Sequence, residues 1–174
     1  MEDLRYPIGK FQYAGVATTE QRKQFIANIA QTPSRLRTAV SGLNEDQLKT
    51  PYRPEGWTIR QVAHHLPDSH LNAYTRFRLA MTEEEPTIRL YHEDRWAELE
   101  DSRNAPIDFS LNLLESLHKR WVYFLESLTE PDFARTFKHP ELGLVSLDKN
   151  LALYSWHGQH HVAQITSLRQ RMNF

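Results

Sequence analysis

Apolar side chains recur every three to four residues along four long segments of this chain, and Pro, Gly, Asn and Asp separate the segments. Such spacing gathers apolar positions on one face of a helix, whereas a strand would alternate apolar and polar residues. The pattern predicts helices over residues 20–40, 58–82, 110–128 and 147–172, with Pro33 interrupting the first. We therefore expect an all-α fold, a four-helix bundle.

Local signals set the ends of three of these helices. Thr58 to Gln61 fits a capping box, in which the Thr hydroxyl accepts a free backbone N–H and the Gln side chain reaches back. Asp108 precedes the third helix, and either Ser146 or Asp148 is expected to cap the last one. Between these two helices, two brief extended runs flank a turn with Pro and Gly, which predicts a short β-hairpin.

Residues 83–106 show little regular pattern apart from a short turn expected around Trp96-Ala97-Glu98-Leu99, so they form a connection that is unusually long for a compact domain. A connection of this length is functional or crosses over the bundle. It contains Tyr91-His92-Glu93-Asp94, which collects potential metal ligands. A solvated polar loop is the more frequent origin of such a run, so we assign it no role.

Length and charge limit the organisation and the partners of the chain. Its 174 residues fall within the usual size of one domain, so we predict a single domain over residues 1–174. The 21 Lys and Arg residues nearly balance the 22 Asp and Glu residues, which argues against nucleic acid or a membrane as a partner. The N-terminus lacks signal-peptide features and no apolar run could span a membrane, so we expect a cytoplasmic protein.

The candidate functional residues of this chain are histidines. The chain has no Cys and nine His, so any metal would be held by nitrogen or oxygen. Most of the histidines crowd into two stretches, HHLPDSH and HGQHH. In the first stretch, helical geometry places His65 and His70 on either side of the core-facing stripe, whereas His64 lies roughly opposite and is predicted to be exposed.

In the second stretch, the same geometry places His157 and His161 at or beside the core-facing stripe and turns His160 away. His157 and His161 are one helical turn apart, so they can share a metal ion. Gly158 stands where the HExxH motif has its general-base Glu, which excludes the mechanism of zinc peptidases.

Spacing alone leaves two questions open. It does not choose between His65 and His70 as a third ligand, and hydrogen-bonded core histidines without any metal would show the same pattern. A third histidine from a neighbouring helix would complete a three-histidine site with open positions, the arrangement typical of catalytic rather than structural metals.

Four segments, YPIGKF, TPYRPEGWTIRQVAHHLPDSH, RWAELEDS and LYSWHGQHHVAQI, resemble the YfiT-like branch of the DinB superfamily, across nearly the whole chain. The order and separation of the two histidine blocks are the most specific part. The resemblance implies a bundle with up-down-down-up connectivity, in which the long second connection crosses the bundle. It also implies one divalent ion per chain, zinc or nickel, and a homodimer.

Matched position by position to the family pattern, the implied metal ligands are His65, His157 and His161. His70 and His160 become neighbours of the site. Pro67 departs from the pattern, because it lies inside the second helix. A proline there removes a backbone hydrogen bond and usually kinks a helix, which would change the orientation of the His65 side chain.

Three neutral imidazoles leave a bound ion its full charge, so it can lower the pKa of a bound water or thiol. The resemblance therefore implies two activities on a small-molecule substrate. The first is transfer of a low-molecular-weight thiol, such as bacillithiol, to an electrophile, and the second is hydrolysis by metal-activated water. We favour the transferase, since no carboxylate stands at the expected general-base position. A third hypothesis is a metal-binding dimer module without catalysis.

Two further side chains are candidates for catalysis. Tyr154 faces inward one turn before His157, where it could donate a proton, although a packed core tyrosine has the same signature. Asp68 lies on the same side of its helix as His65, so it could act as a base or orient the imidazole.

Overall fold

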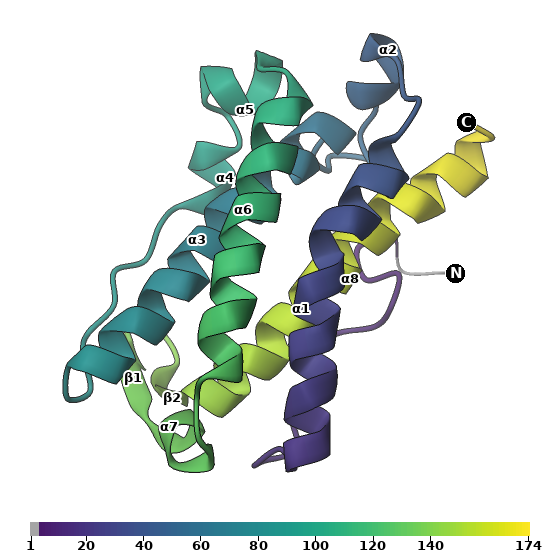
Figure 1. Cartoon of the computed structure of the whole chain (residues 1–174). Helices are drawn as coiled ribbons and strands as arrows, with labels where there is room; N and C mark the ends of the chain where they lie inside the picture. The colour runs from purple at the N-terminus through teal and green to yellow at the C-terminus, as the bar shows by residue number, and fades with distance from the viewer. Residues whose placement is uncertain (1–3) are drawn as a thin grey trace.

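The computed structural model describes residues 4–174. Four long helices dominate it: α1 (Thr19–Val40), α3 (Ile59–Thr82), α6 (Ile107–Glu126) and α8 (Leu147–Met172). Short elements connect them: α2 (Glu45–Leu48), α4 (Glu93–Trp96), α5 (Glu100–Asn104), α7 (Glu130–Ala134) and the strands β1 (Thr136–His139) and β2 (Gly143–Ser146). The predicted four-helix bundle is confirmed (Figure 1).

The direction of the long helices follows the up-down-down-up order (Figure 1). α3 and α6 run the same way, so the connection between them must return along the length of the bundle. It is not irregular throughout, because α4 and α5 interrupt it. Its first part is held to the hairpin, where Ile88 N–H donates to Lys138 O and Lys138 N–H donates to Pro86 O.

Helix starts agree with the capping signals in part. Thr58 forms the predicted capping box with Gln61 at the start of α3. Ser146 caps α8 by accepting from Lys149 N–H, at the end of an antiparallel hairpin that pairs β1 with β2. The prediction for Asp108 was wrong, because α6 begins at Ile107 and Asp108 lies within its first turn.

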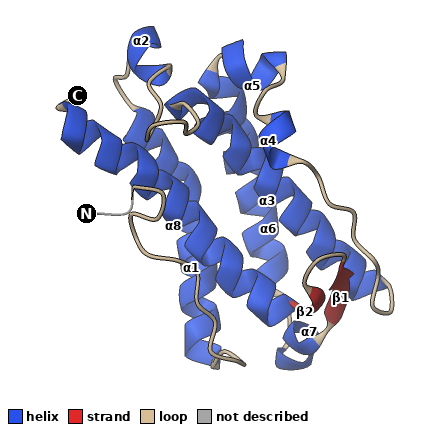
Figure 2. Ribbon diagram, turned by 180° about the vertical axis from the view of Figure 1, so that it is seen from behind, coloured by secondary structure: helices blue, strands red, loops and turns tan. Residues whose placement is uncertain are grey.

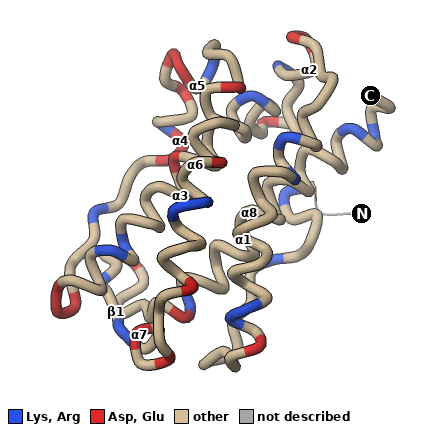
Figure 3. Tube along the Cα trace, in the orientation of Figure 1, with Lys and Arg blue, Asp and Glu red and all other residues tan. Residues whose placement is uncertain are grey.

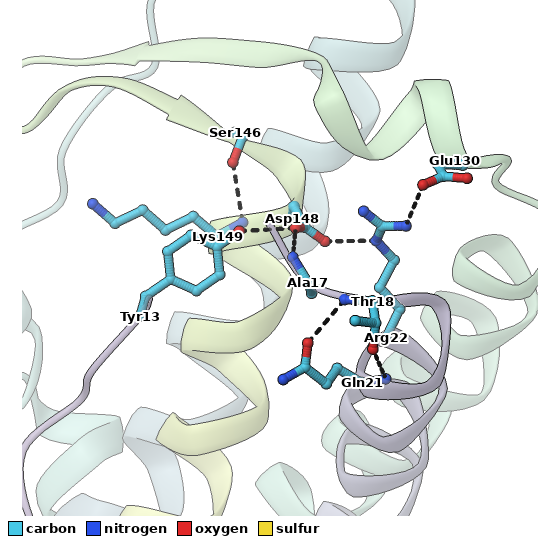
Figure 4. A network of polar contacts seen from close by, with 9 residues as sticks. All are labelled: Tyr13, Ala17, Thr18, Gln21, Arg22, Glu130, Ser146, Asp148 and Lys149. Carbon is cyan, nitrogen blue, oxygen red and sulfur yellow. Dashed lines mark hydrogen bonds and ion pairs between the residues drawn. The ribbon is translucent and has the colours of Figure 1, made fainter. Parts of the chain in front are cut away.

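Asp148 does not cap α8 but holds the N-terminal segment against it. Its carboxylate accepts from Arg22 Nε at 2.7 Å, from Ala17 N–H at 2.6 Å and from the Tyr13 hydroxyl at 2.8 Å (Figure 4). Burial and the neighbouring Asp148 raise the pKa of Tyr13 to about 12. The segment before α1 therefore runs back along α8, as Figure 2 shows from behind.

Pro33 does not interrupt α1, contrary to the prediction, and α3 likewise continues through Pro67. A proline inside a helix leaves the carbonyl four residues earlier without its usual donor. At Pro33 this carbonyl belongs to Ile29, and it accepts instead from His118 Nδ1 at 2.7 Å. A side chain of α6 thus replaces the missing backbone donor of α1.

Two apolar clusters fill the bundle. One lies toward the hairpin and includes Phe77, Trp121, Phe137 and Leu151; the other includes Leu36, Leu66, Leu114 and Ile165. Along α3, α6 and α8, the residues between these clusters are histidines: His70, His118, His157 and His161. The interior therefore has a polar layer across its middle.

Charges of both signs are scattered over the outside of the bundle, so no face is uniformly basic or acidic (Figure 3). Within residues 4–174, no helix is both long and apolar enough to cross a membrane.

Candidate metal centre

Three histidines from two helices meet at one point of the polar layer. His65 comes from α3, and His157 and His161 come from successive turns of α8. His65 Nε2 lies 3.3 Å from His157 Nε2, which lies 3.2 Å from His161 Nε2. Among the described residues, this is the group of three or more His, Asp or Glu side chains placed to share an ion.

The partner of His161 decides which of its nitrogens carries the proton. Gln164 Nε2 donates to the carbonyl of Arg5 at 3.0 Å, which turns Gln164 Oε1 toward His161 Nδ1 at 2.9 Å. An amide oxygen only accepts, so His161 Nδ1 carries the hydrogen and its Nε2 keeps a lone pair. That lone pair points at the other two imidazoles.

His157 is held in a similar way. Its Nδ1 lies 3.1 Å from His70 Nε2, which leaves Nε2 facing His161 and His65. Nitrogens bound to one ion at tetrahedral angles, with metal–nitrogen distances of about 2.0–2.1 Å, lie roughly 3.3 Å apart. The spacing and the converging lone pairs therefore fit a divalent metal ion.

Burial keeps these imidazoles in the neutral form that binds metal. His65 and His161 are 5% and 8% exposed, and Trp57 covers His65 with ring centroids 4.7 Å apart. Burial, followed by the neighbouring His160, lowers the pKa of His65 to about 3. Burial and the neighbouring histidines lower the pKa values of His157 and His161 well below their ordinary range.

The three histidines open onto a pocket with a volume of about 560 Å³. Its wall includes the aromatic rings of Tyr6, Trp57 and Trp156 and the cationic side chains of Arg5 and Arg53. A bound ion would therefore keep a side accessible to small molecules, as catalytic sites do and closed structural sites do not.

Glu93 and Asp94 of α4 also line this pocket. The sequence alone pointed to no role for this run. The expectation that no carboxylate occupies the general-base position beside the metal stays a prediction. Partial burial and then the neighbouring Asp94 raise the pKa of Glu93, although part of its surface remains in solvent. Glu93 and Asp94 lie in the connection after α3, in a stretch without a helical pattern of apolar residues. Only their place in an unusually long connection could have drawn attention to them.

The two side chains predicted as catalytic lie outside the wall of the pocket. Tyr154 is 4% exposed and packs its ring against His157 and His70, with its hydroxyl 3.4 Å from Ser69 Oγ. Asp68 is half-buried, and burial followed by Asp101 raises its pKa to about 6. Their catalytic roles stay predictions.

Two histidines expected at the surface are buried. His64 is 5% exposed, and its Nδ1 lies 2.7 Å from Ser110 Oγ on α6. His160 is 6% exposed, and it stacks on Trp156 and contacts Tyr6 of the N-terminal segment. Both His70 and His160 are neighbours of the site, as the family pattern implied: His70 Nε2 lies 3.1 Å from His157 Nδ1, and the ring of His160 lies 4.9 Å from that of His161.

Comparison with known proteins agrees with this arrangement. The sequence model of the DinB superfamily matches residues 28–165. A protein of Bacillus mycoides (strain KBAB4), named "Putative metal-dependent hydrolase", is 54% identical over 100% of both chains. A protein of Bacillus cereus (strain 03BB102) with the same name is 53% identical over 100% of both chains.

Two solved structures have the same fold. YfiT from Bacillus subtilis, described as a "probable metal-dependent hydrolase with an unusual four-helix bundle topology", is 46% identical, with a TM-score of 0.96 over 99% of each chain. A second four-helix bundle protein is 17% identical, with a TM-score of 0.55 over 81% of this chain and 94% of the other. The second likeness concerns the fold alone.

Proposed function

Because this chain belongs to the DinB superfamily, we propose that it is a metal-dependent hydrolase in which His65, His157 and His161 hold one divalent ion. The observation that carries the proposal is the convergence of three imidazoles, two buried and one half-buried, in the wall of an accessible pocket. Imidazole ligands suit zinc and nickel, which are the ions we propose.

A divalent ion held by these three histidines would supply a Lewis acid, able to polarise a substrate oxygen and to lower the pKa of water. The chain supplies the other parts of the reaction. Glu93, whose raised pKa brings it closer to neutrality, accepts a proton from the attacking water and returns it to the leaving group. Gln164 and His70 hold the Nδ1 hydrogens of the two α8 histidines, which keeps their Nε2 atoms available.

The pocket favours a small substrate with an anionic group. Its volume of about 560 Å³ falls within the range of sites for small organic molecules. Arg5 and Arg53 in its wall can bind a carboxylate or phosphate of the substrate, while the aromatic rings cover an apolar part. We propose a small carboxylate- or phosphate-bearing ester or amide.

We prefer hydrolysis to thiol transfer because Glu93 and Asp94 line the pocket, where they offer a general base for water. These carboxylates at an open pocket also argue against a metal-binding module without catalysis. Thiol transfer on the same metal remains an outcome that an assay can distinguish.

The test compares Glu93→Gln with the wild type on a panel of small anionic esters and amides, in protein loaded with zinc or nickel. We expect kcat to fall by roughly 100-fold or more with little change in KM, since a general base acts in the transition state. Glu100→Gln, an exposed Glu of α5 whose side chain bonds Asn104, is the matched control and should retain full activity.

Two results would contradict the proposal: absence of hydrolysis across the panel in metal-loaded wild type, or conjugation of a low-molecular-weight thiol to electrophiles without any hydrolysis. Equal activity of Glu93→Gln and wild type would remove Glu93 from the mechanism.

A further inference from the structure

A row of three histidines, of which two are fully buried and one is half-buried, leads from the backbone of α1 to the candidate metal centre. It begins at the Ile29 carbonyl, which has no helical donor because Pro33 lacks an N–H. His118 Nδ1 lies 2.7 Å from this carbonyl oxygen. The row therefore starts at a group that is fixed by the helix and can only accept a hydrogen bond.

The row continues without a gap. His118 Nε2 lies 2.8 Å from His70 Nδ1, and His70 Nε2 lies 3.1 Å from His157 Nδ1. His70 and His118 are 0% and 1% exposed, so water does not compete for these contacts. The last free atom of the row is His157 Nε2, which faces the other two metal-site histidines.

The start of the row decides where every hydrogen sits. A neutral imidazole has one N–H donor and one acceptor nitrogen. Because the Ile29 carbonyl accepts, His118 must carry its hydrogen on Nδ1 and accept at Nε2. His70 must then donate from Nδ1 and accept at Nε2, so His157 donates from Nδ1 and keeps a lone pair on Nε2.

We propose that the Ile29 carbonyl, released by Pro33, sets the tautomers of His118, His70 and His157 in series and so holds His157 Nε2 ready to bind the ion. His118 and His70 are positioning residues for the metal centre, which they influence from α6 and α3. This proposal rests on the proposed function only in naming a metal ion as the group that binds the lone pair of His157 Nε2.

Loss of His118 has a specific consequence at the far end of the row. Without the His118 acceptor, His70 is free to place its hydrogen on Nε2 and donate to His157 Nδ1. His157 would then carry its own hydrogen on Nε2, where it blocks the metal. The substitution thus acts on a ligand that His118 does not touch.

The direct test is the tautomer of each histidine by ¹⁵N–¹H correlation NMR of the whole chain, metal-free and zinc-loaded. We expect His118, His70 and His157 to carry the hydrogen on Nδ1 in both forms. A hydrogen on Nε2 of His118 or His70 in either form, or of His157 in the metal-free form, would overturn the proposal. The metal-free spectrum needs no variant, and it tests the row even if the chain binds no zinc.

The second measurement is zinc affinity, by competition with a chromophoric chelator, for wild type, His118→Phe and His64→Phe. His64 is a matched control because it is equally buried on α3 but bonds Ser110 outside the row. We expect His118→Phe to lose about 10- to 100-fold in affinity, with His157 shifted toward the Nε2–H tautomer, and His64→Phe to stay near wild type. Equal affinities of His118→Phe and wild type would overturn the proposal, whereas a wild type that binds no zinc would overturn the proposed function.

Discussion

Burial makes each histidine of the polar layer a basic group that stays neutral in the folded protein. His118 shows this most simply, because it is 1% exposed and, among residues 4–174, has no acidic side chain within hydrogen-bonding distance. Burial lowers its pKa from 6.5 to about 4, against a smaller opposing effect of the Ile29 carbonyl. A positive charge on this ring would lie in the bundle interior without an acidic partner, and desolvation of that charge costs more than the hydrogen bond to the Ile29 carbonyl recovers.

The metal-free protein should therefore lose stability in mild acid. Above pH 6.5, His118 is neutral in both the folded and unfolded chain, so it contributes no pH dependence. Between pH 6.5 and about 4, the unfolded chain binds a proton that the folded chain does not, so the free energy of unfolding falls. The loss from this residue reaches at most about 3 kcal/mol.

Urea unfolding of metal-free protein at a series of pH values measures this loss. His118→Gln should show a shallower decline between pH 6.5 and 4 than the wild type, whatever its stability at pH 7.5. A flat wild-type profile over that interval would show that the ring is protonated in the folded state.

Sequence periodicity located the three ligands' helices but misjudged individual histidines. A helical wheel is oriented by the main apolar stripe alone, and residues on the opposite face are therefore predicted to be exposed to solvent. His64 lies opposite that stripe on α3, but Ser110 of α6 and the Ala105 carbonyl cover it. His160 is covered by Tyr6 from the N-terminal segment, whose path along α8 no local pattern encodes.

At the scale of elements, the position of α8 against α1 sets the position of His157 and His161. Gly158 of α8 packs directly against Thr32 of α1. A Cβ at this residue would lie 2.5 Å from Thr32 Oγ1 and 2.8 Å from Thr32 Cγ2. Thr32 is 1% exposed, and its hydroxyl donates to Asn28 O, so it has little room to move. The glycine that excludes an HExxH motif therefore has a packing role.

Gly158→Ala is expected to destabilise the protein, although alanine is the better helix former. The helix propensity gain is about 1 kcal/mol, whereas overpacking costs about 1–3 kcal/mol, and displacement of α8 should also weaken zinc binding. Thr32→Ala removes the two closest atoms, so the double variant should recover most of the loss in urea unfolding. A single Gly158→Ala variant as stable as the wild type would contradict this packing account.

The long helices were predictable because their signals are local: apolar spacing within each segment and capping residues such as Thr58 and Ser146. The short helices α2, α5 and α7 were missed, since each has only about one turn and no apolar face that periodicity could reveal. Pro33 was read as a break because its compensation, His118, lies on a different helix.

At the scale of the whole molecule, the metal site joins elements that are far apart in the sequence. His65 lies on α3, His157 and His161 on α8, and the pocket wall adds α4 and the N-terminal segment. The Asp148 network holds that segment to α8 (Figure 4). An ion bound at this point therefore connects parts of the fold that separate on unfolding.

Metal binding should stabilise the folded chain by linkage. Free zinc at a concentration of about 100 Kd adds about 2.7 kcal/mol, which corresponds to a rise in Tm of roughly 5–10 °C for a chain of this size. Calorimetry with zinc and with a chelator measures the difference. His157→Ala should show little of this shift, and an equal shift in that variant would mean that zinc acts elsewhere.

The most direct test of the metal centre is metal content by mass spectrometry on protein purified without a polyhistidine tag. Wild type should carry about one ion per chain, and His65→Ala, His157→Ala and His161→Ala should each lose most of it, because each removes one of three ligands. His139→Ala, a histidine of the hairpin, is the control and should keep the ion. A wild type that remains metal-free after exposure to zinc and nickel, or ligand variants that retain the ion, would contradict the account.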